Sequence, residues 1–588
     1  MSLRDLAASR RRFLAGMSAM GLGSTLLPGV LWAQIDGSGA AEVSTAMIRD
    51  AARVAGLSFS DAEITGMQQQ VNQSLQRIGK IRRQTIANDV APPFVFSPIT
   101  AGMKVDRSSP ARFVLSPLPA LQRPARIESL AYWPVRHLAQ LIQSRQLTSL
   151  ELTQLFIARL KRYNAQLNCV VTLLEAPAIA QARRADAELA AGRYRGPLHG
   201  IPWGAKDIIS VAGHPTTWGS GAYRDQVFDY DASIVERLNE AGAVCIAKLS
   251  TGELAGGDQW WGGRTNNPWK LDEGASGSSA GPGAATAAGC VPFAIGTETG
   301  GSILSPSARC GVSGLRPTFG RVSRYGVMAL SWTQDRLGPM CRTAEDCALV
   351  LSVITGPDGR DLSVSEIPFH YDAAIRPSEL KVGYLPQAFD DADRLPDWKR
   401  NDAATLAMLR GLGATLVPLK LPDFDVETIQ LSVEAAVFFD ELLRSGRDKQ
   451  MTNKSRADRF RVSRLIPAVD YLQSQRLRAV MMQQLAAATA GVDVYLAPST
   501  NGNPRAPDGA PAAIPATPPN RTQQHSQMAN LACYPGLAVP NGFANSGAPT
   551  SVLFMAQPFA EGKLLALARA YQAATDFHLQ QPPLFAVG

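Results

Sequence analysis

The chain has few histidines and cysteines, and it lacks the patterns in which these residues usually carry out chemistry. Its 588 residues include six His and seven Cys. No CxxC, HExxH or P-loop motif occurs, and the cysteines show no zinc-ligand spacing. The sequence therefore predicts no metal, nucleotide or other cofactor, and no essential disulfide framework. We expect Cys290 and Cys310 to be buried thiols.

Strong charge is also missing, which excludes some classes of partner. Charged residues make up 18% of the chain, and the formal net charge is +8 at pH 7. No basic cluster with interleaved aromatic residues occurs, so no nucleic-acid partner is predicted. With 45% hydrophobic residues, the length and composition are typical of a soluble enzyme with one large α/β core and additions.

Glycine and serine, by contrast, are concentrated in residues 296–320, GTETGGSILSPSARCGVSGLRPTFG. Closely spaced glycines let the backbone approach a bound group, and their amides can point at an oxyanion. Ser302 lies in this segment, and a serine in such a turn can act as a nucleophile once a base takes its proton. No histidine lies nearby in a suitable pattern. The candidate base is Lys206, in GIPWGAKDI.

A lysine can act as this base only when it is neutral. Its reference pKa is about 10.4, and complete burial lowers the pKa by up to ~3–5 units. The segment around Lys206 is apolar enough for burial, although Asp207 would oppose the shift if its side chain pointed the same way. A second serine between base and nucleophile can relay the proton, because a hydroxyl both donates and accepts.

Taken together, these segments resemble the amidase signature family. The matching pieces appear in the family's order, at residues 199–208, 274–289, 294–327, 335–351, 492–500 and 530–543. The resemblance implies an α/β fold in which helices cover both faces of a central mixed β-sheet. It also implies hydrolysis of a carbon–nitrogen bond in a small-molecule amide, with an ester-hydrolysing side activity.

The resemblance also implies a role for particular residues. Ser302 corresponds to the nucleophile that forms the acyl-enzyme. Ser278, the first residue of a Ser-Ser pair, corresponds to the bridging serine, which the family holds next to a cis peptide bond. Lys206 corresponds to the base at the end of the relay. The amides of Thr299, Gly300, Gly301 and Ser302 would form the oxyanion hole. For Ser279, the second residue of the pair, we expect only a structural role.

Two positions depart from the family pattern. Leu304 stands two residues after Ser302, where many members carry Arg, and this leaves Asp335 without the partner expected for it. Pro282 follows Ala280 and Gly281, where Gly-Gly is more usual. Because proline fixes φ and removes a donor, we expect a stiffer turn after the bridging serine.

The N-terminus predicts export. Residues 9–14, SRRRFL, match a twin-arginine motif, and an apolar run follows from residue 14 to 32. We expect the twin-arginine machinery to export the chain to the periplasm or the medium, with cleavage after Ala33. An uncleaved membrane anchor is the alternative, because a run of about 19 residues is borderline for a span.

The sequence divides into three segments: a signal at 1–33, an N-terminal extension at 34–126 and an amidase domain at 127–588. In the extension, residues 58–86 predict an amphipathic helix, and the Pro-rich remainder either wraps the core, covers the site or is a flexible linker. Helices are predicted at 147–163, 171–195 and 471–490, and strands at 201–209, 380–386 and 414–421. Residues 501–525 predict a loop.

Other functions stay open at this point. GRVSRYGV is similar to the A-subunit branch of the glutamyl-tRNA amidotransferases, which supplies the glutaminase, although the export signal argues against that role. A catalytically inactive scaffold with the same fold is a further alternative. Trp218, Trp260, Trp261 and Trp269 would favour an aromatic or extended acyl group only if they face the site. Whether the chain forms a homodimer is left open.

Overall fold

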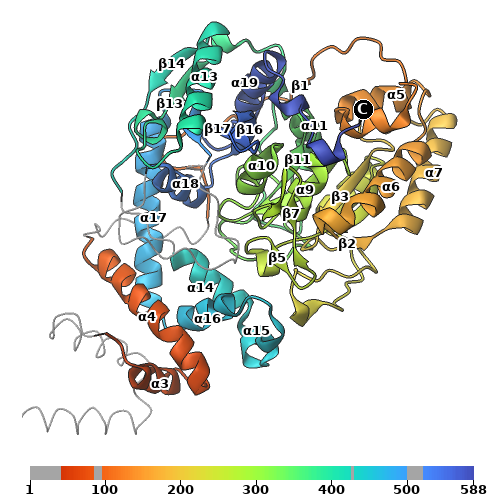
Figure 1. Ribbon diagram of the computed structural model, residues 1–588. Coiled ribbons are helices and arrows are strands. Elements are labelled where there is room, and N and C mark those ends of the chain that lie inside the picture. The colour runs from red at the N-terminus through yellow and green to blue at the C-terminus, as the bar shows by residue number, and fades with distance from the viewer. Residues whose placement is uncertain (1–41, 85–95, 425–428, 500–520, 588) are drawn as a thin grey trace, which may run out of the picture. The chain divides into compact units, whose positions relative to one another are not determined.

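The computed structural model describes residues 42–84, 96–424, 429–499 and 521–587, and these form two compact units (Figure 1). The first unit contains residues 42–84, 429–449 and 453–477, and the second contains the other described residues. The predicted export signal and residues 501–520 of the predicted loop lie outside the described residues.

The first unit is helical. Its helices are α3 (Thr45–Val54), α4 (Asp61–Arg82), α14 (Ile429–Phe438), α15 (Asp440–Arg444) and α16 (Lys454–Ser463). A capping box starts α4, because the Ser60 hydroxyl accepts from the Glu63 amide while the Glu63 carboxylate accepts from the Ser60 amide. Apolar side chains from α3, α4 and the segment around Val462 pack together. The helix predicted within residues 58–86 is thus confirmed.

An 11-stranded mixed sheet forms the centre of the second unit. In spatial order its strands are β14 (Thr415–Pro418), β13 (Lys381–Tyr384), β15 (Val494–Pro498), β17 (Pro549–Met555), β16 (Gly536–Phe543), β10 (Ser313–Arg316), β11 (Arg336–Cys341), β9 (Phe293–Glu298), β3 (Pro202–Lys206), β4 (Val244–Leu249) and β2 (Val170–Leu173). Strands β14, β13 and β15 run parallel, as do β9, β3 and β4. The remaining neighbours are antiparallel.

Helices flank this sheet, which confirms the predicted fold class (Figure 1). They are α5 (Val135–Gln143), α6 (Ser149–Leu167), α7 (Glu175–Ala190), α8 (Ser233–Glu240), α9 (Ala280–Ala287), α10 (Leu304–Cys310), α11 (Ala344–Ile354), α13 (Pro396–Gly411), α18 (Arg521–Leu531) and α19 (Glu561–Ala573), with α17 at Ala468–Thr489. As predicted, α6 begins after a Thr148 cap, and Glu151 completes the capping box. None of the described helices is both long enough and apolar enough to span a bilayer.

Two predicted elements need correction. Residues 170–173 form strand β2, so the helix predicted at 171–195 begins only at Glu175 and ends at Ala190. The loop predicted at 501–525 is wrong for residues 521–525, which are the first turn of α18. Both errors concern where a helix begins. Tertiary packing outweighs local propensity at the ends of elements, so the sequence places these ends poorly.

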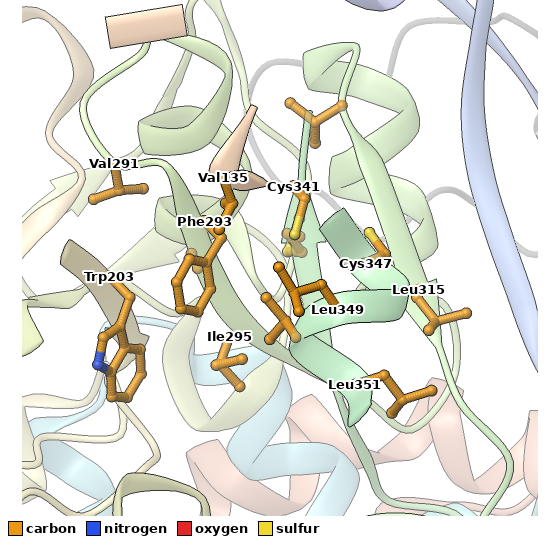
Figure 2. Packing of buried hydrophobic residues seen from close by; sticks show 14 of the residues in the cluster. Val135, Trp203, Val291, Phe293, Ile295, Leu315, Cys341, Cys347, Leu349 and Leu351 are labelled. Carbon is orange, nitrogen blue, oxygen red and sulfur yellow. The ribbon is translucent and has the colours of Figure 1, made fainter. Parts of the chain in front are cut away.

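The core lies between the sheet and its helices. On the adjacent strands β3 and β9, the rings of Trp203 and Phe293 are nearly parallel, with centroids 6.2 Å apart. Figure 2 shows these rings beside Ile295, and it places Cys341 and Cys347 in the same cluster. All seven cysteines are buried and unpaired, which confirms the prediction for Cys290 and Cys310. In the described ranges, no group of His, Cys, Asp or Glu side chains is arranged to hold a metal.

Residues 96–123 of the predicted extension lie against the core of the second unit. Strand β1 (Phe113–Val114) pairs in parallel with β12 (Tyr371–Asp372). Ser116 donates to the Glu345 carboxylate through its amide and its hydroxyl, each at 2.7 Å. The Phe96 ring lies edge-on to the Phe319 ring with centroids 4.9 Å apart, and the Arg478 guanidinium lies 4.0 Å from the Phe96 ring centroid. These contacts fit the alternative in which this segment wraps the core.

Arg461 holds three carboxylates together in the first unit, which gives a stability prediction. Its guanidinium pairs with Glu63 at 2.9 Å, with Asp458 at 2.7 Å and with Asp448, and its side chain is 7% exposed. Arg461→Met would leave this acidic cluster without a counter-charge. We expect the opening free energy of α4 and α16 to fall by about 3–5 kcal/mol, measured by hydrogen exchange.

Arg49→Met is the matched control for this prediction. Arg49 pairs with Asp61 at 2.6 Å, but the two side chains are 46% and 88% exposed. Exposed pairs contribute little, so we expect a change within about 1 kcal/mol. Equal protection of α4 and α16 in both variants would contradict the role assigned to Arg461.

Candidate active site

The predicted catalytic residues come from the ends of neighbouring elements. Lys206 is the last residue of β3, and Glu298 is the last residue of its parallel neighbour β9. Ser302 lies in the turn that follows β9, and Ser278 lies just before α9. Binding sites often form at the carboxyl ends of parallel strands, where the following turns converge. The Ser279 amide donates to the Ser302 carbonyl at 3.1 Å, which joins the two serine segments.

Lys206 is completely buried among hydroxyl groups. Its Nζ lies 2.8 Å from Ser278 Oγ, 3.0 Å from Ser279 Oγ and 2.7 Å from Thr297 Oγ1. Burial lowers the pKa of Lys206 to about 7, although the charges of Asp335 and Glu298 act in the opposite direction. At neutral pH a large share of this lysine is therefore uncharged, which is the state that a base requires.

Asp207 follows Lys206 in the sequence, but its side chain pairs with a different lysine and does not oppose the pKa shift of Lys206 by direct contact. Its carboxylate lies 2.9 Å from Lys248 Nζ, and both side chains are completely buried. It also accepts hydrogen bonds from the amide and the hydroxyl of Thr217. The acidic charges that oppose the low pKa of Lys206 are instead those of Asp335 and Glu298.

The Ser-Ser segment is fixed by close backbone packing. The Gly277–Ser278 peptide bond is cis. A Cβ atom on Gly277 would lie 1.8 Å from the Gly257 carbonyl oxygen, so only glycine fits there. Ser279 Oγ accepts from the Thr297 amide and donates to the Thr297 carbonyl, each at 3.1 Å. Ser279 therefore ties this segment to β9, in line with its predicted structural role.

Pro282 is compatible with the helix that follows. It is the third residue of α9, where backbone N–H groups have no partner within the helix. The missing donor therefore removes no helical hydrogen bond. This departure from the family pattern leaves the position of Ser278 intact.

The turn after β9 is held by a buried carboxylate. Glu298 Oε2 accepts from the amides of Ile303 at 2.7 Å and Leu304 at 2.9 Å, and Oε1 accepts from Arg316 Nη1 at 2.7 Å. Burial alone would raise the pKa of Glu298, but the charges of Arg316 and Arg336 and these amides hold it below its usual value. Gly301 has a φ of +110°, which favours glycine at this position of the turn.

The segment predicted to form the oxyanion hole is anchored through Thr299. The Thr299 hydroxyl donates to Asp335 Oδ1 at 2.6 Å, and Arg336 Nη2 donates to the Thr299 carbonyl at 2.8 Å. Among the described residues, the amides of Gly300, Gly301 and Ser302 donate no hydrogen bond to the protein. These donors are thus available to a ligand, as an oxyanion hole requires.

The hydroxyl of Ser302 is not yet linked to the rest of the predicted relay. Ser302 is half-buried and the neighbouring Gly300 is exposed. Within the described part of the chain, no hydrogen bond joins Ser302 Oγ to Ser278. Catalytic hydrogen bonds are often long before substrate binds. The structure therefore brings Lys206 and Ser278 into hydrogen-bond distance and places the Ser302 backbone beside them.

The structure also shows the surroundings of Leu304 and Asp335, which form the other departure from the family pattern. Leu304 is buried in an apolar cluster with Met528, Leu531 and other side chains. Asp335, which has no Arg at position 304 to pair with, accepts from Thr299 and from the amides of Leu330 and Ser331. Burial raises the pKa of Asp335 despite these hydrogen bonds.

Sequence reasoning missed four residues that shape this site. Glu298 is a charged residue at the end of a mostly apolar stretch, and this contrast was a usable signal. Arg336 follows three polar residues, so nothing marked it. Thr297, which contacts Lys206 Nζ, is one of several threonines, so nothing marked it. Arg316 follows a glycine-rich stretch, and its pairing with Glu298 depends on a contact that only the fold reveals.

The tryptophans have protein partners. Trp260 is buried, and its ring lies edge-on to Trp261 with centroids 4.9 Å apart. The indole N–H of Trp261 donates to Thr217 Oγ1 at 3.0 Å, and that of Trp269 donates to the Cys310 carbonyl at 2.9 Å. These contacts favour a packing role for the three residues.

Comparisons with known proteins find similar sequences and similar folds. A family model described as Amidase matches residues 151–565. The A subunit of glutamyl-tRNA(Gln) amidotransferase from Roseiflexus sp. is 36% identical over 470 residues, which cover 75% of this chain and 96% of that protein. The peptide amidase of Stenotrophomonas maltophilia is similar in structure, with a TM-score of 0.67 and 30% identity over 78% of this chain and 100% of its own. The corresponding A subunit from Thermotoga maritima has a TM-score of 0.63 and 26% identity, over 76% of this chain and 95% of its own.

The low pKa of Lys206 predicts how stability depends on pH. The unfolded chain carries Lys206 at its ordinary pKa of 10.5, whereas burial lowers the pKa to about 7 in the folded state. Between these values the unfolded state binds more protons, so this group makes stability rise with pH from about 7 to 10.5. We expect Lys206→Met to flatten this rise, measured as denaturation midpoints across the window.

Lys161→Met is the control for this measurement. Lys161 pairs with Glu175 at 2.7 Å, and its side chain is 52% exposed. Its substitution should leave the slope of stability against pH unchanged. An unchanged slope in Lys206→Met would mean that Lys206 stays charged in the folded protein.

Proposed function

The chain belongs to the amidase family, and we propose that it hydrolyses the carbon–nitrogen bond of an amide through an acyl-enzyme on Ser302. The observation that most supports this proposal is the buried Lys206, whose Nζ lies 2.8 Å from Ser278 Oγ. A buried lysine with a pKa of about 7 and a serine partner has the properties of a base that needs no histidine.

In the proposed reaction, neutral Lys206 accepts a proton from Ser278 while Ser278 takes the proton of Ser302. Ser302 Oγ attacks the amide carbonyl, and the amides of Thr299, Gly300 and Gly301 stabilise the resulting oxyanion. The proton then returns from Lys206 through Ser278 to the leaving amine, which departs and leaves the acyl-enzyme. A water molecule, activated by the same relay, releases the acid and restores Ser302.

The proposed relay does not by itself restrict the substrate to one kind of amide. Small, aryl, fatty and peptide amides all present the same carbonyl to Ser302. The structural similarity to a peptide amidase favours peptide amides among them. Because an ester forms the same acyl-enzyme and has a better leaving group, we also propose an ester-hydrolysing side activity.

A glutaminase component of an amidotransferase is the second candidate, because curated relatives 36% identical to this chain carry the amidotransferase name. Such a component would hydrolyse glutamine and pass the ammonia to partner subunits. Glutamine turnover that rises only in the presence of those partners would favour this candidate. Rapid hydrolysis of simple amides by the isolated chain would favour the amidase. An inactive scaffold would lack both activities.

For the intact protein we propose three segments and an exported location. Residues 1–33 would be a twin-arginine signal, residues 34–126 an extension and residues 127–588 the amidase domain. The proposal rests on the SRRRFL motif and the apolar run after it. An intact mass of the exported protein that lacks residues 1–33 would support it, and retention of these residues would favour a membrane anchor.

The nucleophile is tested by a serine-directed fluorophosphonate. We expect one adduct, which peptide mapping places on Ser302, because the relay should activate only this hydroxyl. Ser302→Ala should abolish the adduct and lower amide hydrolysis by about 1,000-fold or more.

Ser305→Ala serves as the matched control, because this exposed serine lies on the same segment, three residues further on. It should keep the adduct and the rate. Normal turnover by Ser302→Ala would refute the assignment of the nucleophile.

Lys206→Ala is expected to lower amide hydrolysis more than ester hydrolysis, because an amine leaving group needs a proton and a weakly basic phenoxide does not. In the unmodified enzyme, kcat/KM for an amide should rise with pH through about 7, where Lys206 loses its proton. Both trends are measured with an acyl anilide and the matching phenyl ester. A normal amide rate in Lys206→Ala would exclude the lysine base.

A further inference from the structure

Arg336, the first residue of β11, has an unusual set of contacts. Its side chain is almost fully buried, with an exposure of 2%. Its Nη2 donates to the Thr299 carbonyl at 2.8 Å, whereas Nε and Nη1 have no hydrogen-bond partner among the described residues. Unpaired buried donors cost stability, and in native proteins they often mark a functional constraint.

Arg336 makes no direct contact with the nearby carboxylates, although its charge helps to keep the pKa of Glu298 low. Glu298 already has Arg316 and two backbone amides as partners. Asp335 accepts from the Thr299 hydroxyl and from two further amides. No ion pair within 4.0 Å joins Arg336 to a carboxylate in the described part of the chain. Its one hydrogen bond, to the Thr299 carbonyl, is therefore its most specific contact.

That carbonyl belongs to the same peptide group as the Gly300 amide. A cationic donor on the carbonyl oxygen draws electron density from the peptide group and makes its N–H a stronger donor, since hydrogen bonds in a chain polarise one another. Gly300 is exposed, and its amide donates to no described residue. Asp335 fixes the Thr299 side chain at the same time.

We propose that Arg336 is a positioning residue that orients and polarises the Thr299–Gly300 peptide, so that the Gly300 amide stabilises the oxyanion of the reaction. This inference rests on the proposed function, because it assigns the oxyanion to the turn that carries Ser302. Burial lowers the pKa of Arg336 only to about 10, so its charge is kept at neutral pH.

Arg342, just beyond the end of the same strand, provides a matched control. It directly follows β11, is 5% exposed and also donates to backbone carbonyls, those of His578 at 3.0 Å and Gln580 at 3.1 Å. Burial likewise lowers the pKa of Arg342 to about 10. Its bonds, however, go to the C-terminal segment and not to the oxyanion turn.

The test compares Arg336→Gln, Arg336→Lys and Arg342→Gln in the full-length protein. The measurements are kcat and KM for an acyl anilide, and the affinity for a trifluoromethyl ketone that forms a tetrahedral adduct with the serine. We expect Arg336→Gln to lower kcat by about 10- to 100-fold, less than the roughly 100- to 1,000-fold for a lost oxyanion donor. KM should change little, and the trifluoromethyl ketone should bind more weakly by a similar factor.

The controls separate this role from a structural one. Arg336→Lys should recover most of kcat, because it keeps the charge, and Arg342→Gln should keep both kcat and ketone affinity even if its melting temperature falls. If Arg336→Gln does not fold, Arg336→Met, which needs no hydrogen-bond partner, replaces it. Unchanged kcat in the Arg336 variants, or an equal loss in Arg342→Gln, would overturn the inference. Absence of a Ser302 adduct in the unmodified protein would overturn the proposed function as well.

Discussion

The site depends on one constraint, which is that Lys206 is buried without a carboxylate in direct contact. Three hydroxyls surround its Nζ, and burial favours the neutral amine because it penalises the charged ammonium. The neighbouring Asp207 would defeat this arrangement if it turned toward Lys206. Its pairing with Lys248, on the adjacent strand β4, removes that charge from the immediate surroundings of the base.

The carboxylates that organise the turn work against the neutral lysine. Glu298 fixes the amides after Ser302, and Asp335 fixes Thr299, yet both raise the pKa of Lys206. Arg316 and Arg336 lie close enough to Glu298 to lower its pKa, so they also offset part of its field. The pKa of Lys206, about 7, is thus a balance between two effects. Burial lowers it, and the carboxylates that hold the turn rigid raise it.

Much of this fold could be predicted from local patterns, because short-range effects such as helix capping and apolar runs decide where these elements form. The Thr148 cap with Glu151 predicted the start of α6, and the apolar run around Trp203 predicted β3. The glycine-rich motif of Ser302 and the apolar motif of Lys206 were specific enough to single out both residues, and their catalytic roles stay a prediction. Thr297 could not be predicted as a partner of Lys206, because 91 residues separate them and only the pairing of β3 with β9 brings them together.

Two relatives with different names share this fold, so the fold alone does not decide the substrate. The alignment with the amidotransferase relative covers 96% of that protein but 75% of this chain. Part of this chain therefore lies outside the aligned region. Phe96 precedes the family match, yet it covers the guanidinium of Arg478, which in turn donates to Thr333. Thr333 lies two residues before Asp335, the anchor of Thr299. Three contacts thus connect a segment outside the family match to Thr299, next to the turn that carries Ser302.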